Sequence, residues 1–423
     1  MLRGAAAAAH ADAAAPDDSD DIGLRRALRR SQRREQWRAA ILVLPLFVFI
    51  AACFVVPIGA MLARGVIDTD IARILPGVTQ ALRSWDGRDL PAEAAFAALV
   101  ADIHAAREAG TLASAATRLN YDVPGFRTLL FGTGRVLPKE LSGPARDVLI
   151  GIDPKWGERE TWVAIRRAGG PTTDFYLLGA LDLRRDADNE VIGAPSEQRV
   201  FRAVLGRTLW IAGVVTLVCL VLGYPVALVI ARQPPQRAAI LIFLVLLPFW
   251  TSLLVRTVAW VVLLQKEGVL NSMLLSLSIV NEPLKMIYNR FAVYVAMIHV
   301  LLPFMVLPLY SVMRSISPTY LRAASSLGAT PWTAFRRVYM PQTLPGIAAG
   351  CLMVFIQALG YYITPALVGG ADDQMISYFI AFYASKTVNW GMAAALSIML
   401  LASTLVLYAV YNRLIAVDRM RLA

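Results

Sequence analysis

Six runs of almost entirely apolar residues dominate this 423-residue sequence, and each is long enough to cross a lipid bilayer. A helix needs about 20 consecutive apolar residues to span the hydrocarbon core, because each residue adds about 1.5 Å. Apolar runs of about 10–14 residues would instead be typical of helices buried in a soluble core. The sequence therefore predicts an all-α membrane protein with about six transmembrane helices, at residues 39–63, 207–231, 239–264, 291–314, 345–368 and 391–415.

The placement of arginine orients these spans. Seven arginines between Arg25 and Arg38 precede the first span, and further arginines occupy alternate loops and the end of the chain. Loops rich in Lys and Arg stay in the cytoplasm. Both termini are therefore expected in the cytoplasm of a bacterial inner membrane, and residues 1–38 are expected to form a basic, mostly disordered cytoplasmic region. The same rule accounts for the net charge of +11 without a nucleic-acid partner.

A segment of mixed charge, residues 64–203, separates the first two spans and is expected in the periplasm. Residues 91–120 carry apolar side chains at helical spacing. Residues 162–166 and 174–183 are typical of strands, joined through a hairpin at residues 169–171. The sequence therefore predicts an inserted α+β domain that needs no disulfide, because the segment contains no cysteine.

The chemistry of most enzyme classes is absent from the sequence. No Gly-x-x-x-x-Gly-Lys-Ser/Thr loop occurs, so the chain is not expected to bind ATP by that motif. Only three histidines are present, and no Cys/His cluster has metal-ligand spacing. We therefore predict no catalytic residues, no metal and no cofactor. If the chain takes part in active transport, its ATPase is expected on another polypeptide.

The cytoplasmic loop between the fourth and fifth spans, residues 315–344, carries arginines and no acidic residue. Gly328 and Pro331 are expected to break it into two short helices, each with an apolar side at helical spacing. Two short amphipathic helices at a membrane surface are suited to a groove on another protein. The apolar sides are formed by Ala323, Ala324 and Leu327 in the first helix and by Phe335, Val338 and Tyr339 in the second.

This loop resembles the EAA loop of binding-protein-dependent ABC importer permeases. The family pattern is Glu-Ala-Ala, three residues, Gly, nine residues, a branched apolar residue, one residue, then Leu-Pro. Here Arg322 replaces the Glu and Met340 the Leu, while Ala323, Ala324, Gly328, Val338 and Pro341 match. The resemblance implies that the loop docks on an ATPase subunit and transmits its motion. The coupling residues it implies are Arg322, Ala323, Ala324, Leu327, Gly328, Phe335 and Pro341.

Residues 247–271 and 358–370 are similar to signatures of the spermidine/putrescine-type permeases. The resemblance runs from residue 201 to the C-terminus and does not extend to the insert. It implies the type I ABC importer permease fold for residues 204–423. It also implies a second permease subunit, two ATPase subunits and a periplasmic solute-binding protein as partners.

Polar and aromatic side chains within the spans are candidates to line a translocation pathway. Arg256 is expected either to line a central cavity or to reach outward to the lipid headgroups. Gln357 can face the pathway or hydrogen-bond another helix, and His299 is expected to be a hydrogen-bonded packing residue. The pathway candidates are Trp250, Arg256, Trp260, Gln357, Tyr361 and Tyr362.

The solute class stays open. Aromatic faces suit a polyamine, but no Asp or Glu occurs between Gln198 and Lys266 or from Phe291 to Ala371. An anionic or zwitterionic solute is the alternative to a polyamine-like one. A membrane receptor or scaffold with a ligand-sensing periplasmic domain is the alternative to a permease.

Overall fold

The computed structural model describes residue 37 and residues 41–186 and 188–421, with side chains described up to residue 413. Except for Trp37, the expected basic region 1–38 lies outside the described residues. The chain forms two compact units, residues 1–61 and 62–423, and each is described by itself. The first unit contains most of the first span, which is helical from Ile41 and passes through a π-helical turn, Ala51–Val55, into α2 (Val56–Ala63).

Among the described residues, five helical segments are long and apolar enough to cross a membrane, and a bent pair of helices gives a sixth. This agrees with the six spans expected from sequence. The five are Ile41–Ala63, Ser196–Ala231, Arg290–Ser315, Pro331–Gly360 and Trp390–Arg413.

The third expected span, residues 239–264, is not one straight helix. Helix α12 (Pro235–Leu246) ends in a 3₁₀ turn, Leu247–Trp250, and α13 (Leu253–Leu264) follows at an angle of 90°. Pro248 lies in the turn, and the Ser252 hydroxyl accepts a hydrogen bond from the Val255 amide at 3.2 Å, capping the new helix. A proline turn followed by a serine N-cap restarts the helix in a new direction.

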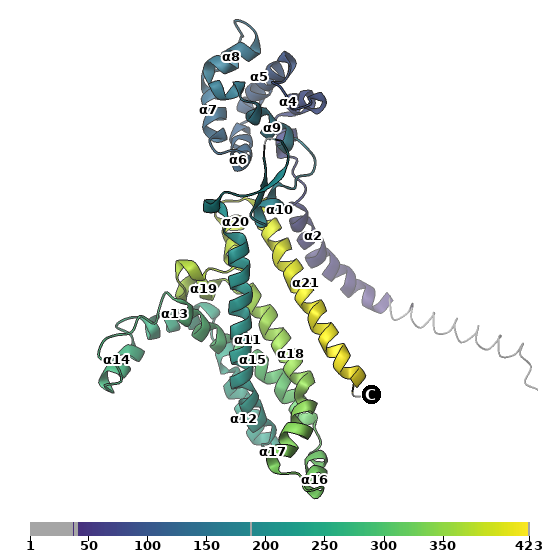
Figure 1. The fold of residues 1–423 in the computed structure, drawn as a ribbon, viewed down its shortest axis with the longest axis vertical. Coiled ribbons are helices and arrows are strands. Elements are labelled where there is room, and N and C mark those ends of the chain that lie inside the picture. Colours follow the sequence, from purple (N-terminus) through teal and green to yellow (C-terminus); the bar gives the residue numbers. More distant parts are fainter. Residues whose placement is uncertain (1–36, 38–40, 187, 422–423) are drawn as a thin grey trace, which may run out of the picture. The chain divides into compact units, whose positions relative to one another are not determined.

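Three helices form the centre of the apolar core. Helix α11 (Phe201–Ala231), α15 (Arg290–Ser315) and α18 (Met340–Gly360) pack against one another (Figure 1). Close packing is possible because α18 presents Gly350, where a Cβ atom would lie 2.7 Å from the sulfur of Met305. Small residues at such crossings let helix backbones approach in a membrane.

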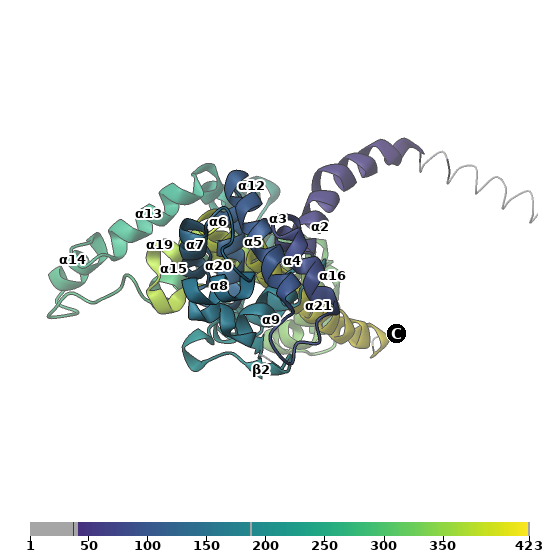
Figure 2. The same cartoon turned by 90° about the horizontal axis from the view of Figure 1, so that it is seen from above.

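The fifth expected span, residues 345–368, consists of two helices. Helix α18 ends at Gly360, and α19 (Ile363–Val368) follows after a break at Tyr361 and Tyr362. Helix α13 packs on α19, and α14 continues beyond α13 in both views (Figures 1 and 2). The remaining helices of this region are α14 (Val269–Ser276), α16 (Pro318–Ser326), α17 (Pro331–Ala334), α20 (Ile376–Ser385) and α21 (Trp390–Arg421).

The insert is helical, so the expected α+β domain is wrong. Its described strands are two of three residues each, β1 (Leu183–Arg185) and β2 (Val191–Gly193), paired antiparallel. Residues 162–166 and most of 174–183, expected as strands, are helical. The expected helix at 91–120 is divided between two helices by a turn at Gly110. The helices are α3 (Asp70–Ile74), α4 (Pro76–Ala81), α5 (Glu93–Glu108), α6 (Leu112–Asp122), α7 (Phe126–Val136), α8 (Ala145–Ile152), α9 (Arg159–Ala168) and α10 (Phe175–Ala180).

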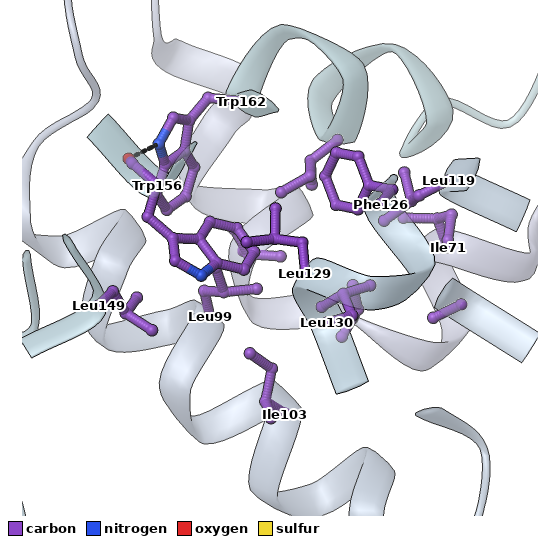
Figure 3. Close-up of a cluster of buried hydrophobic side chains, with 14 of the residues drawn as sticks. Ile71, Leu99, Ile103, Leu119, Phe126, Leu129, Leu130, Leu149, Trp156 and Trp162 are labelled. Carbon is purple, nitrogen blue, oxygen red and sulfur yellow. Dashed lines mark hydrogen bonds between the residues drawn. The ribbon is translucent and has the colours of Figure 1, made fainter. Parts of the chain in front are cut away.

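The insert has an aromatic core of its own (Figure 3). Trp156 and Trp162 are fully buried, and the ring of Trp162 lies 4.3 Å from that of Phe96 between centroids. Both indole nitrogens are satisfied, since Trp156 donates to the Thr133 hydroxyl and Trp162 to the Trp156 carbonyl, each at 2.8 Å. Large rings with paired polar atoms give a small helical domain a well-packed centre.

Candidate functional site

The loop between α15 and α18 folds as the two short helices expected from sequence. Ser317 caps α16, whose first residue is Pro318, and Thr330 caps α17, whose first residue is Pro331. Gly328 has a φ of +82°, and the Ala329 amide bonds back to the Ala324 carbonyl at 3.0 Å. This is a glycine-terminated helix end, which turns the chain sharply between the two helices.

The second short helix is continuous with the membrane helix that follows it. Helix α17 passes through a π-helical turn, Phe335–Tyr339, directly into α18. Phe335 stacks on Trp332 and on Tyr339, each with ring centroids 5.9 Å apart, and meets Tyr224 of α11 edge to face. This end of the loop is therefore continuous with α18 and contacts α11 through Phe335.

The exposed side of the loop agrees only in part with the expected one. Leu327 is 89% exposed and Trp332 is 69% exposed, whereas Ala324 is only 9% exposed. Arg322, Ala323, Gly328 and Pro341 are exposed, and Phe335 is half-buried. The large outward groups are thus Tyr320, Leu327 and Trp332, and of the two alanines only Ala324 is buried. Trp332 was missed from sequence, although an aromatic residue in a basic loop is a visible signal.

A second candidate site contains Arg256 on α13 and the aromatic side chains next to it. Its Nε and Nη1 atoms are buried and have no hydrogen-bond partner among the described residues. The guanidinium carbon lies 5.8 Å from the centroid of Phe249, which packs edge to face on Phe304. The observed contacts of Arg256 are therefore aromatic, and no carboxylate among the described residues forms an ion pair with it.

The pathway candidates are divided between partly buried and exposed positions. Trp260 donates from its indole nitrogen to Nδ1 of His299 at 3.1 Å, which makes His299 the hydrogen-bonded residue expected from sequence. Tyr361 is half-buried at the break between α18 and α19. Trp250, Gln357 and Tyr362 are exposed on the described surface. Three residues of this region were not predicted from the sequence. They are Phe249, which contacts Arg256, and Thr257 and Thr364, whose hydroxyl oxygens lie 3.3 Å apart.

A buried ion cluster lies where the insert meets the last membrane helix. Arg118 of α6 bonds to Asp68 and, at 2.8 Å, to Asp122. Its guanidinium carbon lies 5.2 and 5.1 Å from the ring centroids of Phe175 and Tyr176. Burial raises the pKa of Asp122, although Arg118 opposes that shift. Burial tends to lower the pKa of Arg118, but the two carboxylates and Tyr176 hold it above its usual value.

Tyr176 connects this cluster to α21. A Cβ atom on Gly391 would lie 2.3 Å from Cε2 of Tyr176, so the ring rests directly on the backbone of α21. Tyr176 belongs to a small apolar cluster that also includes Ala180, Val204, Ile376 and Met392. The insert is therefore seated on the membrane helices through a specific aromatic contact, not only through its chain connections.

The described residues contain no group of three or more His, Cys, Asp or Glu side chains that could hold a metal ion.

Comparisons with known proteins agree with the class of protein that these features define. The family described as "Binding-protein-dependent transport system inner membrane component" matches residues 208–416. The spermidine/putrescine transport system permease protein PotB of Haemophilus influenzae is 37% identical over 247 residues, which cover 57% of this chain and 86% of that protein. PotB of Escherichia coli is 39% identical over 197 residues, which cover 47% of this chain and 72% of that protein.

A solved bacterial alginate ABC transporter, in complex with an alginate pentasaccharide-bound periplasmic protein, also aligns with this chain. Its TM-score is 0.43 and its sequence is 21% identical, over 51% of this chain and 78% of that chain. The molybdenum transport system permease protein ModB of Mycobacterium bovis is 29% identical over 56% of this chain and 88% of that protein.

The fold and the loop define a multi-pass inner-membrane subunit of a transporter. The chain belongs to the binding-protein-dependent transport system inner membrane component family and is a permease subunit of an ABC importer. The resemblance seen in its sequence is thereby confirmed.

Proposed function

We propose that this permease forms a translocation pathway together with a second permease subunit. In this proposal a periplasmic binding protein delivers the solute and two ATPase subunits drive transport. The observation that carries the proposal is the two-helix loop, residues 318–341, which presents exposed apolar side chains on a basic surface and continues directly into α18.

Coupling is proposed to begin at Leu327 and Trp332. These two groups are 89% and 69% exposed, and large apolar groups at a protein surface are typical binding contacts. Arg322, Ala323, Gly328 and Pro341 lie in the same exposed loop. Ala324 and Phe335 are assigned an internal role: they hold the loop against the membrane helices, so that its motion reaches α11 and α18.

The proposed solute is a polyamine or a related organic molecule, as the names of the PotB relatives favour. Trp250, Trp260, Tyr361 and Tyr362 supply aromatic faces that attract cations. One observation favours a different solute class. Arg256 has unpaired buried nitrogens and no carboxylate near it in the sequence of its span, which suits the anionic group of a zwitterionic or anionic solute.

The test is binding-protein-stimulated ATP hydrolysis by the complete complex in lipid nanodiscs. The complex is purified through a tag on this chain, with its neighbouring transport genes co-expressed. We expect the ATPase to co-purify, and spermidine or putrescine with the binding protein to stimulate hydrolysis. Stimulation by a zwitterionic or anionic solute alone would replace the polyamine assignment. Isolation of the chain without any ATPase would favour the receptor or scaffold reading.

A further inference from the structure

An open cavity of about 330 Å³ lies on the insert. It is formed by the end of α5, the first turn of α6 and the second half of α7. Its volume falls at the lower end of the range of about 300–1,000 Å³ typical of small-molecule sites. Its lining includes Arg107, Leu112, Ala113, Phe131, Gly134 and Arg135.

Two glycines shape this cavity. Gly110 has a φ of +69°, which turns the chain from α5 into α6. Gly134 brings α7 against α6, since a Cβ atom there would lie 2.8 Å from Cδ2 of Leu112. The position of the cavity is therefore fixed by packed helices and not by a surface loop.

The charges around the cavity are all positive. Arg107 donates from Nη1 to the Gly134 carbonyl at 2.8 Å, and its guanidinium makes no other hydrogen bond with the described residues. Arg135 has no hydrogen-bond or ion-pair partner among the described residues, and no acidic side chain lines the cavity. Arg127, one turn before Phe131 on α7, lies 5.9 Å from the Phe131 ring.

We propose that this cavity binds a small organic anion. A carboxylate or phosphate group would bind between Arg107 and Arg135, because guanidinium groups match the planar, two-oxygen geometry of such anions. The apolar part of the ligand would rest on Phe131 and Leu112, which give the cavity its hydrophobic wall. The site is independent of the translocation pathway and of the solute that the permease carries.

The test is isothermal titration of the full-length chain in detergent. The probes are phthalate and benzoate as carboxylates, inorganic phosphate, and putrescine as a cationic control. We expect saturable binding of phthalate, benzoate or phosphate and none of putrescine. A carboxylate response assigns the ligand as a carboxylate, and a response to phosphate alone assigns it as a phosphate compound.

Two variants locate the binding. Arg135→Gln removes an exposed guanidinium that makes no hydrogen bond or ion pair with the described residues, so we expect at least about tenfold weaker binding in a folded protein. Ala113→Trp fills the cavity without changing charge and should abolish binding. Arg83→Gln changes an exposed arginine elsewhere on the insert and should leave affinity unchanged. The proposal is overturned if no anionic probe binds saturably, or if Arg135→Gln and Ala113→Trp both bind like the parent protein.

Discussion

Arg256 carries two buried guanidinium nitrogens without a hydrogen-bond partner among the described residues, on a membrane helix that contains no carboxylate. Moving a charged group out of water costs several kcal/mol for each ion unless a partner compensates the charge. The aromatic ring of Phe249 supplies only part of such compensation. A second subunit or the solute is therefore the expected partner of this side chain.

Replacing Arg256 tests that assignment. Arg256→Ala should lower solute uptake at least about tenfold while assembly with the ATPase stays normal, because only a pathway contact is lost. Arg256→Lys should recover little activity, since an ammonium group cannot reproduce a stacked or two-pronged guanidinium contact. Uptake by cells that express the cognate binding protein measures the effect. Arg237→Ala, at an exposed arginine of α12, is the matched control, and full uptake by Arg256→Ala would remove the residue from the pathway.

Asp102 in the insert should give the stability a pH dependence. Burial raises its pKa above the ordinary 3.8, and hydrogen bonds from the Val78 and Gly77 amides offset part of that shift. The folded state then binds the proton more tightly than the unfolded chain. The contribution of Asp102 to stability is therefore largest below pH 3.8 and is lost as the pH rises through the folded pKa.

Asp102→Asn should remove this dependence, because the amide keeps an acceptor oxygen but cannot ionise. The melting temperature of the variant relative to the parent protein should rise as the pH is raised from about 4 to about 7. Thermal unfolding of the full-length chain at several pH values measures this. A difference that stays constant across the series would show that the carboxyl group titrates as in water.

At the scale of elements, two contacts connect the membrane helices to parts outside them. The two-helix loop joins α18 through the continuous π-helical turn, and the insert joins α21 through Tyr176. The first contact lies at an end of α18 and the second near the start of α21. Each can be altered without changing the hydrophobic core of the spans.

Leu327→Asp should uncouple the loop from its ATPase. Leu327 is 89% exposed, so an aspartate there is solvated and the permease keeps its fold, but the apolar docking contact is lost. Retention of the ATPase on the tagged permease should fall at least about tenfold with no change in melting temperature. Val136→Asp, at a 64% exposed residue of the insert, is the control. Normal ATPase retention would remove Leu327 from the docking surface.

Ala324→Asp should behave differently, because Ala324 is 9% exposed and packs inside the loop. Burying a charge there should lower the melting temperature of the permease itself, in addition to any loss of docking. A melting temperature equal to that of Leu327→Asp would contradict the internal placement of Ala324.

Gly391→Ala should loosen the contact between the insert and α21. Its new methyl group would overlap the Tyr176 ring, and overpacking of this kind costs about 1–3 kcal/mol. In a Tyr176→Ala background the same substitution should cost little, since the ring is gone. Thermal unfolding of the parent protein, the two single variants and the double variant gives the coupling free energy between Gly391 and Tyr176. An equal effect of Gly391→Ala in both backgrounds would show that the two residues do not touch.

At the scale of the whole molecule, the distribution of arginine predicts one orientation in the membrane. A reporter fused within residues 64–203 should behave as periplasmic, and one fused after Arg337 as cytoplasmic. Paired alkaline phosphatase and green fluorescent protein fusions at each site make the measurement. Cytoplasmic fluorescence from a fusion in the insert would reverse the orientation, and the two-helix loop could not then meet a cytoplasmic ATPase.

The sequence alone was sufficient for the number and positions of the membrane spans and for the two-helix loop, because both depend on local properties. Apolar length reports whether a helix can cross a bilayer, and Gly328 and Pro331 mark a helix end and a helix start. The family resemblance within residues 201–423 was confirmed for the same reason, since its motifs are short and contiguous.

Tertiary structure decided the features that depend on contacts between distant residues. Residues 162–166 are a helix and not a strand because Trp162 packs on Phe96 and Trp156, and a short apolar run cannot by itself distinguish the two structures. The 90° break before α13 was likewise missed, although Pro248 and Ser252 mark it. Arg118 and Asp68 are 50 residues apart in the sequence, and Tyr176 and Gly391 come from the insert and the last span. Only the folded chain brings such residues together, because their pairing depends on how separate helices pack.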